Sequence, residues 1–159
     1  MRVLAILGIV LSMMACSGAQ SGGPSSGLSK DDAVLETVLL HEIAAASPRP
    51  DEALCLRVRG GPGNEPSVAL LSAIQRRHPR AIVGSACGGG GPDPVRVNDG
   101  GGPGIVFDVG PVKWLGDVAL IEGGGGSRGG AASVREVEYR VERAGAGYKV
   151  VSERVLRQI

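Results

Sequence analysis

The segment Glu136-Val-Glu-Tyr-Arg-Val-Glu142 alternates without interruption between charged and apolar or aromatic side chains. Successive side chains of a β-strand point to opposite faces, so a period of two predicts a strand with one buried face and one solvated face. Ala144-Gly-Ala-Gly147 follows and predicts a turn into a last strand over residues 148–156. The segment therefore predicts an antiparallel hairpin at this end of the chain.

A second hairpin is predicted directly upstream. Ile105, Phe107 and Val109 alternate with their neighbours, and Gly110-Pro111 interrupts that strand before it continues to Leu115. Gly116-Asp117 predicts a tight turn into a returning strand over residues 118–122. The glycine-rich residues 123–132 are then expected to form a loop.

The first half of the chain shows helical patterns instead. Ser29-Lys-Asp-Asp32 has the spacing of a capping box and predicts a helix over residues 30–46, with Leu35, Leu39 and Ile43 on its buried face. Glu65-Pro66-Ser67 opens a second helix, which His78-Pro79 ends. Its expected inner stripe is Val68, Leu71 and Ile74.

These elements predict the fold class. We expect a single α+β domain over residues 29–159, with two helices packed on one face of a mainly antiparallel sheet of about six strands. The alternation of polar and apolar residues along each strand is what indicates a sheet covered on one side.

Two cysteines are placed to form a disulfide. Cys55 lies in a predicted strand over residues 53–59, and Cys87 follows another over residues 81–84. If these strands are neighbours, the two Cβ atoms approach the roughly 4 Å that a disulfide requires. The spacing differs from Cys-x-x-Cys, and neither cysteine has an adjacent Lys or His, so we expect a structural bond and not a redox site.

The remaining cysteine, Cys16, belongs to an export signal. Met1-Arg2 is followed by an apolar run to Met14, too short to span a bilayer but of signal-peptide length. Ala15-Cys16-Ser17-Gly18 resembles the lipobox of bacterial lipoproteins, which implies lipidation of Cys16 and a signal over residues 1–16. The alternative is an ordinary signal cleaved after Ala19. Residues 17–28, mostly Ser, Gly and Pro, predict a flexible tether.

Composition excludes some functions. The formal net charge is +1, so electrostatics gives no case for binding nucleic acid. The chain holds only one Trp, two Tyr and one Phe, which argues against stacking platforms for bases or sugars.

The sequence contains no complete catalytic, cofactor-binding or metal-binding motif. His41-Glu42 begins like His-Glu-x-x-His, but Ala45 stands where the second zinc ligand belongs. The glycines from Gly124 to Gly129 match Gly-x-Gly-x-x-Gly, yet a strand pattern follows where phosphate binding needs a helix. Ser85 lacks the nucleophile-elbow pattern. Asp108 and Asp117 flank the Trp114 segment, and we interpret them as a strand-face and a turn residue.

The domain has two family resemblances. Cys55-Leu-Arg-Val58, Trp114-Leu115 and Tyr139-Arg-Val141 resemble segments of small exported proteins, mostly lipoproteins, of high-GC bacteria, a resemblance that implies no activity. Those proteins often carry further cysteines near the glycine-rich loop that corresponds to residues 123–130, and this chain has none there. The last four strands resemble, at the level of pattern, the cone fold of nuclear transport factor-like proteins, which implies an apolar pocket.

The sequence therefore predicts a lipid-anchored protein of the cell envelope. Its membrane contact is the Cys16 anchor, and its domain is a non-enzymatic module that binds a protein or envelope component. The alternative is a soluble secreted or periplasmic domain that binds a small molecule, or a cone-fold enzyme, with a pocket between helices and sheet.

Overall fold

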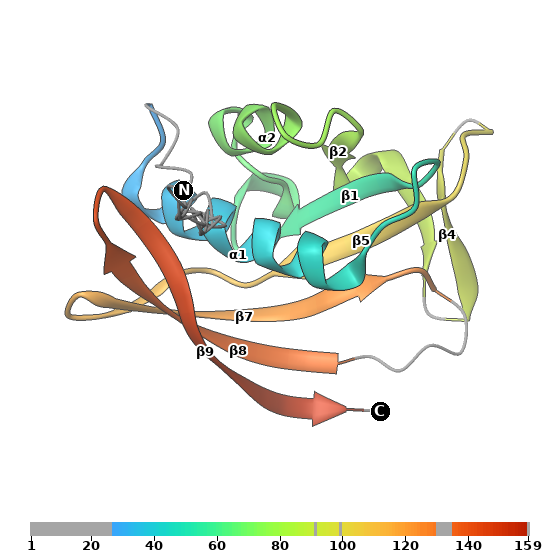
Figure 1. The fold of residues 1–159 in the computed structure, drawn as a ribbon. Helices are drawn as coiled ribbons and strands as arrows, with labels where there is room; N and C mark the ends of the chain where they lie inside the picture. The colour runs from blue at the N-terminus through green and yellow to red at the C-terminus, as the bar shows by residue number, and fades with distance from the viewer. Residues whose placement is uncertain (1–26, 91, 99, 130–134, 159) are drawn as a thin grey trace, which may run out of the picture.

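The computed structural model describes residues 27–90, 92–98, 100–129 and 135–158 (Figure 1). It is an α+β fold with two α-helices, α1 (Lys30–Ala46) and α2 (Val68–Gln75), and a seven-stranded mixed sheet. The predicted signal, the predicted lipidation site at Cys16 and most of the predicted tether lie outside the described residues.

The strand order of the large sheet is β2-β1-β5-β7-β8-β9, with β6 also paired to β7. The strands are β1 (Ala53–Val58), β2 (Ala81–Val83), β5 (Gly104–Val109), β6 (Lys113–Leu115), β7 (Val118–Ser127), β8 (Arg135–Ala144) and β9 (Gly147–Gln158). A separate antiparallel ribbon contains β3 (Cys87–Gly90) and β4 (Asp93–Val97). Two 3₁₀ turns, Pro62–Asn64 and Gly84–Ala86, complete the described elements.

Local signals place both helices. The Ser29 side chain accepts a hydrogen bond from the Asp32 amide at 3.0 Å, which confirms the predicted start of α1. Ser67 caps α2 in the same way by accepting from the Leu70 amide. The Ser67 hydroxyl also donates to Asp32 Oδ2 at 2.9 Å, so the first turns of the two helices are joined.

The hairpins near the C-terminal end follow the prediction. β6 pairs with β7 and β8 pairs with β9, each antiparallel. Val137, Tyr139 and Val141 are buried, as their alternation with charged residues indicated. In Figure 1 these long strands occupy the lower half of the molecule, with α1 lying against them.

The sheet is mainly antiparallel, as predicted, but its other half contains parallel pairings that the sequence did not indicate. β1 runs parallel to both of its neighbours, β2 and β5, so the sheet is mixed although most of its pairings are antiparallel. Cys55, at the centre of β1, pairs with Ile82 on one side and with Val106 on the other. The chain passes through α2 between β1 and β2, as a parallel pair requires.

Two expectations about individual segments were wrong. Residues 123–127 continue strand β7 and are not a loop. Val68 is 84% exposed because α2 begins there, and the buried residues of α2 are Leu70, Ala73 and Ile74.

The apolar residues separate into two clusters. The larger one joins α1 and α2 to alternate residues of the strands, for example Leu56 of β1 and Phe107 of β5. The smaller one contains the intervening residue Cys55 together with Cys87 and Val95 of the ribbon. Strand β9 ends the sheet, and no described strand pairs with its outer edge, along which Val155 and Leu156 are exposed.

Candidate functional site

The predicted disulfide is present. Cys55 and Cys87 are bonded, with their Cα atoms 6.2 Å apart. The bond ties the centre of β1 to the start of the β3–β4 ribbon, against which Val106 also packs. Its role in the described structure is to hold the ribbon onto the sheet.

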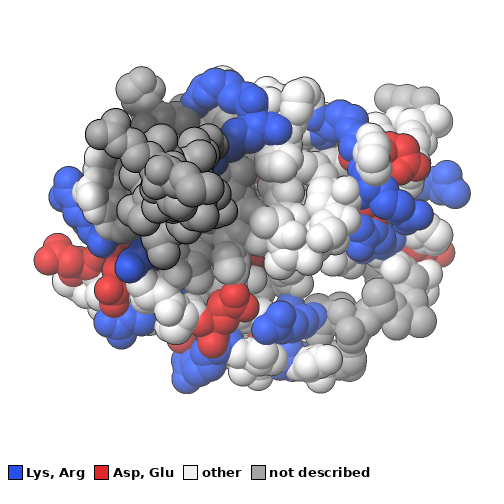
Figure 2. Space-filling model, in the orientation of Figure 1, with Lys and Arg blue, Asp and Glu red and all other residues white. Residues whose placement is uncertain are grey.

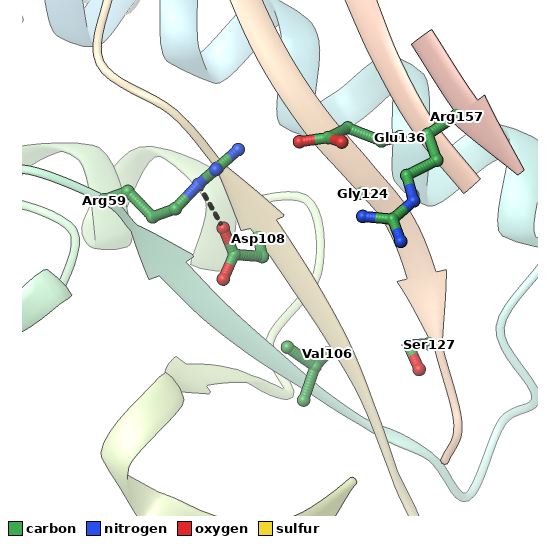
Figure 3. Close-up of a pocket in the computed structure, with 8 residues that line it drawn as sticks. Arg59, Val106, Asp108, Gly124, Ser127, Glu136 and Arg157 are labelled. Carbon is green, nitrogen blue, oxygen red and sulfur yellow. Dashed lines mark ion pairs between the residues drawn. The ribbon is translucent and has the colours of Figure 1, made fainter. Parts of the chain in front are cut away.

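A cavity of about 290 Å³ lies next to this region, over strands β5, β7, β8 and β9 (Figure 3). Its side-chain lining is Arg59, Val106, Asp108, Ser127, Glu136 and Arg157, and the backbone of Gly124 and Gly125 completes it. Val106 and Asp108 alternate along β5 with Ile105, Phe107 and Val109, which belong to the helix-containing core. The cavity therefore opens on the surface of β5 that points away from that core.

Charged groups converge on this cavity from four segments. Arg59 Nε lies 2.9 Å from Asp108 Oδ1, so these two side chains form an ion pair at one side. Glu136 of β8 and Arg157 of β9 are partners in the strand register and project into the same space. Within the described residues, neither Glu136 nor Arg157 forms an ion pair.

Glycines in β7 form the wall between this cavity and the helix side of the sheet. A Cβ at Gly123 would clash with Glu42 Oε1, and one at Gly126 would lie 2.8 Å from Ala46 Cβ, so both glycines allow α1 to approach the strand closely. A Cβ at Gly124 would have no neighbour closer than 3.8 Å. Gly125 adopts φ of 66° at the irregularity in the β5–β7 pairing, a conformation that favours glycine.

Glu42 is buried directly behind these glycines, with 2% of its surface exposed. The Gly125 amide donates to Glu42 Oε1 at 3.2 Å, while Oε2 has no hydrogen-bond partner in the described structure. Burial raises the pKa of Glu42 to about 7, against the opposing effect of hydrogen bonds with Gly125 and Tyr139. The negative charges of Asp108 and Glu153 raise this pKa further.

The residues around Glu42 link α1 to β8 and β9. His41 Nε2 lies 2.6 Å from Glu153 Oε1, and the His41 ring meets the Tyr139 ring edge-on at 5.8 Å between centroids. Burial raises the pKa of the Tyr139 hydroxyl, and the neighbouring Glu42 raises it further. Tyr139 therefore remains neutral at physiological pH, whereas Glu42, whose pKa is about 7, exchanges its proton in that range.

A second buried carboxylate, Glu52, has the opposite environment. Both of its oxygens accept hydrogen bonds from Arg128, and Arg49 donates to them through its backbone amide and its guanidinium. The hydrogen bonds from Arg128 are the main reason that the pKa of Glu52 falls to about 2. This cluster fastens the end of β7 to the segment between α1 and β1.

The structure does not bring together most of the residues that the sequence analysis considered for catalysis or metal binding. His41 contacts Glu153, whereas His78 lies half-buried beyond the end of α2. The Ser85 amide donates to Glu65 Oε1 at 2.8 Å in the turn after β2. Asp117 is exposed in the β6–β7 turn, and Asp108 lines the cavity, so the structure does not support them as a carboxylate pair.

Sequence reasoning missed the residues that define the cavity. Arg59, Glu136 and Arg157 occupy ordinary polar positions of strands or strand ends, and no local pattern distinguishes them. The signal that could have indicated the cavity is the glycine run in β7, which leaves four consecutive positions of that strand without side chains.

The surface seen in Figure 2 carries mixed charge. Blue Lys and Arg and red Asp and Glu residues are interspersed around its periphery, with uncharged residues between them. Among the described residues, no group of three or more His, Cys, Asp or Glu side chains is arranged to hold a metal ion. Neither described helix is long and apolar enough to cross a membrane.

Comparisons with protein-family models, with curated proteins and with solved structures found no match to this chain.

Proposed function

We propose that this chain is an exported protein of the cell envelope, anchored to a membrane by a lipid on Cys16, whose domain is a non-enzymatic binding module. The proposal rests on the three cysteines of the chain. Cys55 and Cys87 are bonded to each other, and such bonds persist in oxidising compartments outside the cytosol. Cys16 is then the one remaining cysteine, and it stands in the lipobox-like sequence after the apolar run.

The proposed binding surface is the sheet surface that carries the 290 Å³ cavity. We infer that both helices cover the opposite surface, because residues of α1 and α2 share one core cluster with Leu56 and Phe107. Apolar side chains form the core between helices and sheet, and a second hollow of about 600 Å³ lies between α1 and the β8–β9 turn, on the side where the alternative of a cone-fold enzyme or binder places its pocket. We place the binding site in the outer cavity instead, because charged groups from four segments converge on it.

A further observation in favour of the alternative is the buried Glu42 between α1 and β7. A carboxyl group whose pKa is about 7 could exchange protons at neutral pH. Glu42 is absent from the lining of the outer cavity, however, and Gly125 separates the two. We therefore assign Glu42 a structural role.

The anchor is tested by the intact mass of the protein isolated from bacterial membranes. We expect a mature chain that begins at Cys16 and carries a diacylglyceryl group, and we expect Cys16→Ser to abolish this mass increment and release the protein from the membrane. A soluble product that begins at Gln20 would establish ordinary secretion. A chain that retains residues 1–15, or free thiols at both Cys55 and Cys87 after native isolation, would contradict export itself.

A further inference from the structure

Among the described residues, the outer cavity combines a cation and an anion that form no ion pair, Arg157 and Glu136, over a floor of backbone. Glu136 and Arg157 face each other across the β8–β9 pairing, yet within the described part of the chain neither has an ion-pair partner. Arg59 and Asp108 on the other side are 2.9 Å apart and neutralise each other. The cavity thus offers one carboxylate and one guanidinium to a ligand, with no net charge among its four charged side chains.

The size of the cavity limits the ligand. One water molecule occupies about 30 Å³ of liquid, so a volume of 290 Å³ has room for about ten non-hydrogen atoms. The floor is backbone, because Gly124 and Gly125 carry no side chain, and Val106 supplies an apolar wall. A dipeptide of two small residues has this size and offers both kinds of charge.

We propose that this cavity binds a small zwitterion of dipeptide size, an inference that rests on the proposed binding role of the domain. The ligand carboxylate pairs with the Arg157 guanidinium, whose planar donors suit a carboxylate. The ligand ammonium pairs with Glu136, and a small apolar side chain packs on Val106. A simple anion is disfavoured because it would also meet the carboxylates of Asp108 and Glu136.

The test uses the full chain as purified, in mild detergent if it is lipidated, and titrates it with the dipeptide Ala-Ala. We expect saturable binding with a Kd of about 1 mM, followed through the amide NMR signals of Gly124 and Gly125. Two capped probes separate the charges: acetyl-Ala-Ala lacks the ammonium, and Ala-Ala-amide lacks the carboxylate. Each should bind about tenfold more weakly than Ala-Ala, which corresponds to about 1.4 kcal/mol.

Three variants connect this binding to the cavity. In Arg157→Gln, Ala-Ala and Ala-Ala-amide should bind equally, and in Glu136→Gln, Ala-Ala and acetyl-Ala-Ala should bind equally. Gly124→Val places a side chain in the cavity and should weaken binding at least about tenfold. Gly102→Val is the matched control, because a Cβ at exposed Gly102 also has its nearest neighbour, the Asp51 carbonyl oxygen, at 3.8 Å. Binding in that variant should be unchanged.

The possible results distinguish a failure of the ligand assignment from a failure of the proposed lipid anchor. Saturable binding by a protein whose Cys16 carries no lipid would leave the ligand assignment standing and remove the anchor. A lipidated protein that binds none of the probes, or one whose Gly124→Val variant binds Ala-Ala normally, would overturn the ligand assignment. The L,L and D,D forms of Ala-Ala distinguish two sources of such a ligand, since tighter binding of L,L indicates protein-derived peptides and tighter binding of D,D indicates cell-wall peptides.

Discussion

Arg128 holds Glu52 through two hydrogen bonds, from Nε at 2.6 Å and from Nη2 at 2.9 Å. The two residues are far apart in the sequence, and Glu52 is 1% exposed. Removing the guanidinium leaves a buried carboxylate with Arg49 as its remaining partner. This pair therefore contributes stability only while both charges are present.

The first prediction concerns this pair. Arg128→Ala should lower the free energy of unfolding by about 1.5–3 kcal/mol, the usual range for hydrogen bonds to charged groups. The pKa of Glu52 is depressed to about 2 from 4.5, so its stabilising effect is present above pH 4.5 and is lost as the pH falls through about 2. Urea unfolding followed by circular dichroism measures both effects. Arg143→Ala, at an exposed position without an ion pair in the described structure, is the control and should change stability little.

The second prediction concerns Glu42, whose pKa is raised to about 7 from 4.5. The unfolded chain loses this proton at a lower pH than the folded chain, so stability is full below pH 4.5 and decreases as the pH rises through about 7. The maximum loss is about 3 kcal/mol. Glu42→Gln should remove this dependence and be more stable than the natural chain at about pH 8. The control variant Asp117→Asn, in an exposed turn, should keep the pH dependence of the natural chain. Equal stability of the natural chain at about pH 5 and pH 8 would contradict the burial of a titrating carboxyl group here.

The third prediction concerns the disulfide, which joins residues separated by 32 positions. Loop-closure entropy for such a separation gives about 3–4 kcal/mol, so the double variant Cys55→Ala/Cys87→Ala should unfold at a much lower urea concentration. Hydrogen exchange should rise most in β3 and β4, which the bond ties to the sheet. An equal rise in hydrogen exchange across all strands would indicate that other contacts hold the β3–β4 ribbon on the sheet.

The fourth prediction concerns Trp114 of β6, which fixes the first turn of α1. Its indole Nε1 donates to Asp31 Oδ1 at 2.8 Å, and Lys30 Nζ lies 3.4 Å from the ring centroid. Trp114→Phe removes the hydrogen bond and weakens the cation–π contact, so we expect a loss of about 1 kcal/mol in unfolding free energy. Lys30→Gln should reproduce part of this loss, and Lys149→Gln, at an exposed position on β9, should show none.

The fifth prediction compares two adjacent glycines of β7. Gly123→Ala inserts a Cβ against Glu42 and within 2.9 Å of the Tyr139 ring, so it should destabilise the protein by about 1–3 kcal/mol. Gly124→Ala has open space and should be nearly neutral. Thermal unfolding of the two variants checks the contrast, and equal effects would mean that α1 does not approach β7 as closely as described.

The antiparallel hairpins could be predicted from the sequence because their information is local. Alternation around Tyr139 and the short turns next to it are properties of neighbouring residues. The parallel pairing of β1 with β2 and β5 has no such local signal, since alternation is the same in parallel and antiparallel strands. The disulfide was predictable because Cys55 and Cys87 were the only cysteines left in the domain.

The length of β7 was missed for a different reason. Glycine is depleted in strands, so Gly123 to Gly126 indicated a loop. The structure shows that two of these positions are small because α1 packs against them, which is a tertiary requirement. The two glycines between them, Gly124 and Gly125, line the cavity, whose charged side chains come from separate strands and could not be derived from any local pattern.

The outer edge of β9, which no described strand pairs with, has a consequence for how copies of this domain meet. An unpaired strand edge with Val155 and Leu156 exposed is a template on which another molecule could add its own backbone. Register irregularities opposite Val137 and Val141 interrupt its regular pairing geometry, and Arg157 places a positive charge beside the apolar side chains, while Arg154 pairs with Glu138. If copies of the domain are crowded side by side, as the proposed anchor implies, the Arg157 charges would disfavour edge-to-edge pairing, and this barrier to fibrillar stacking would fall at high ionic strength.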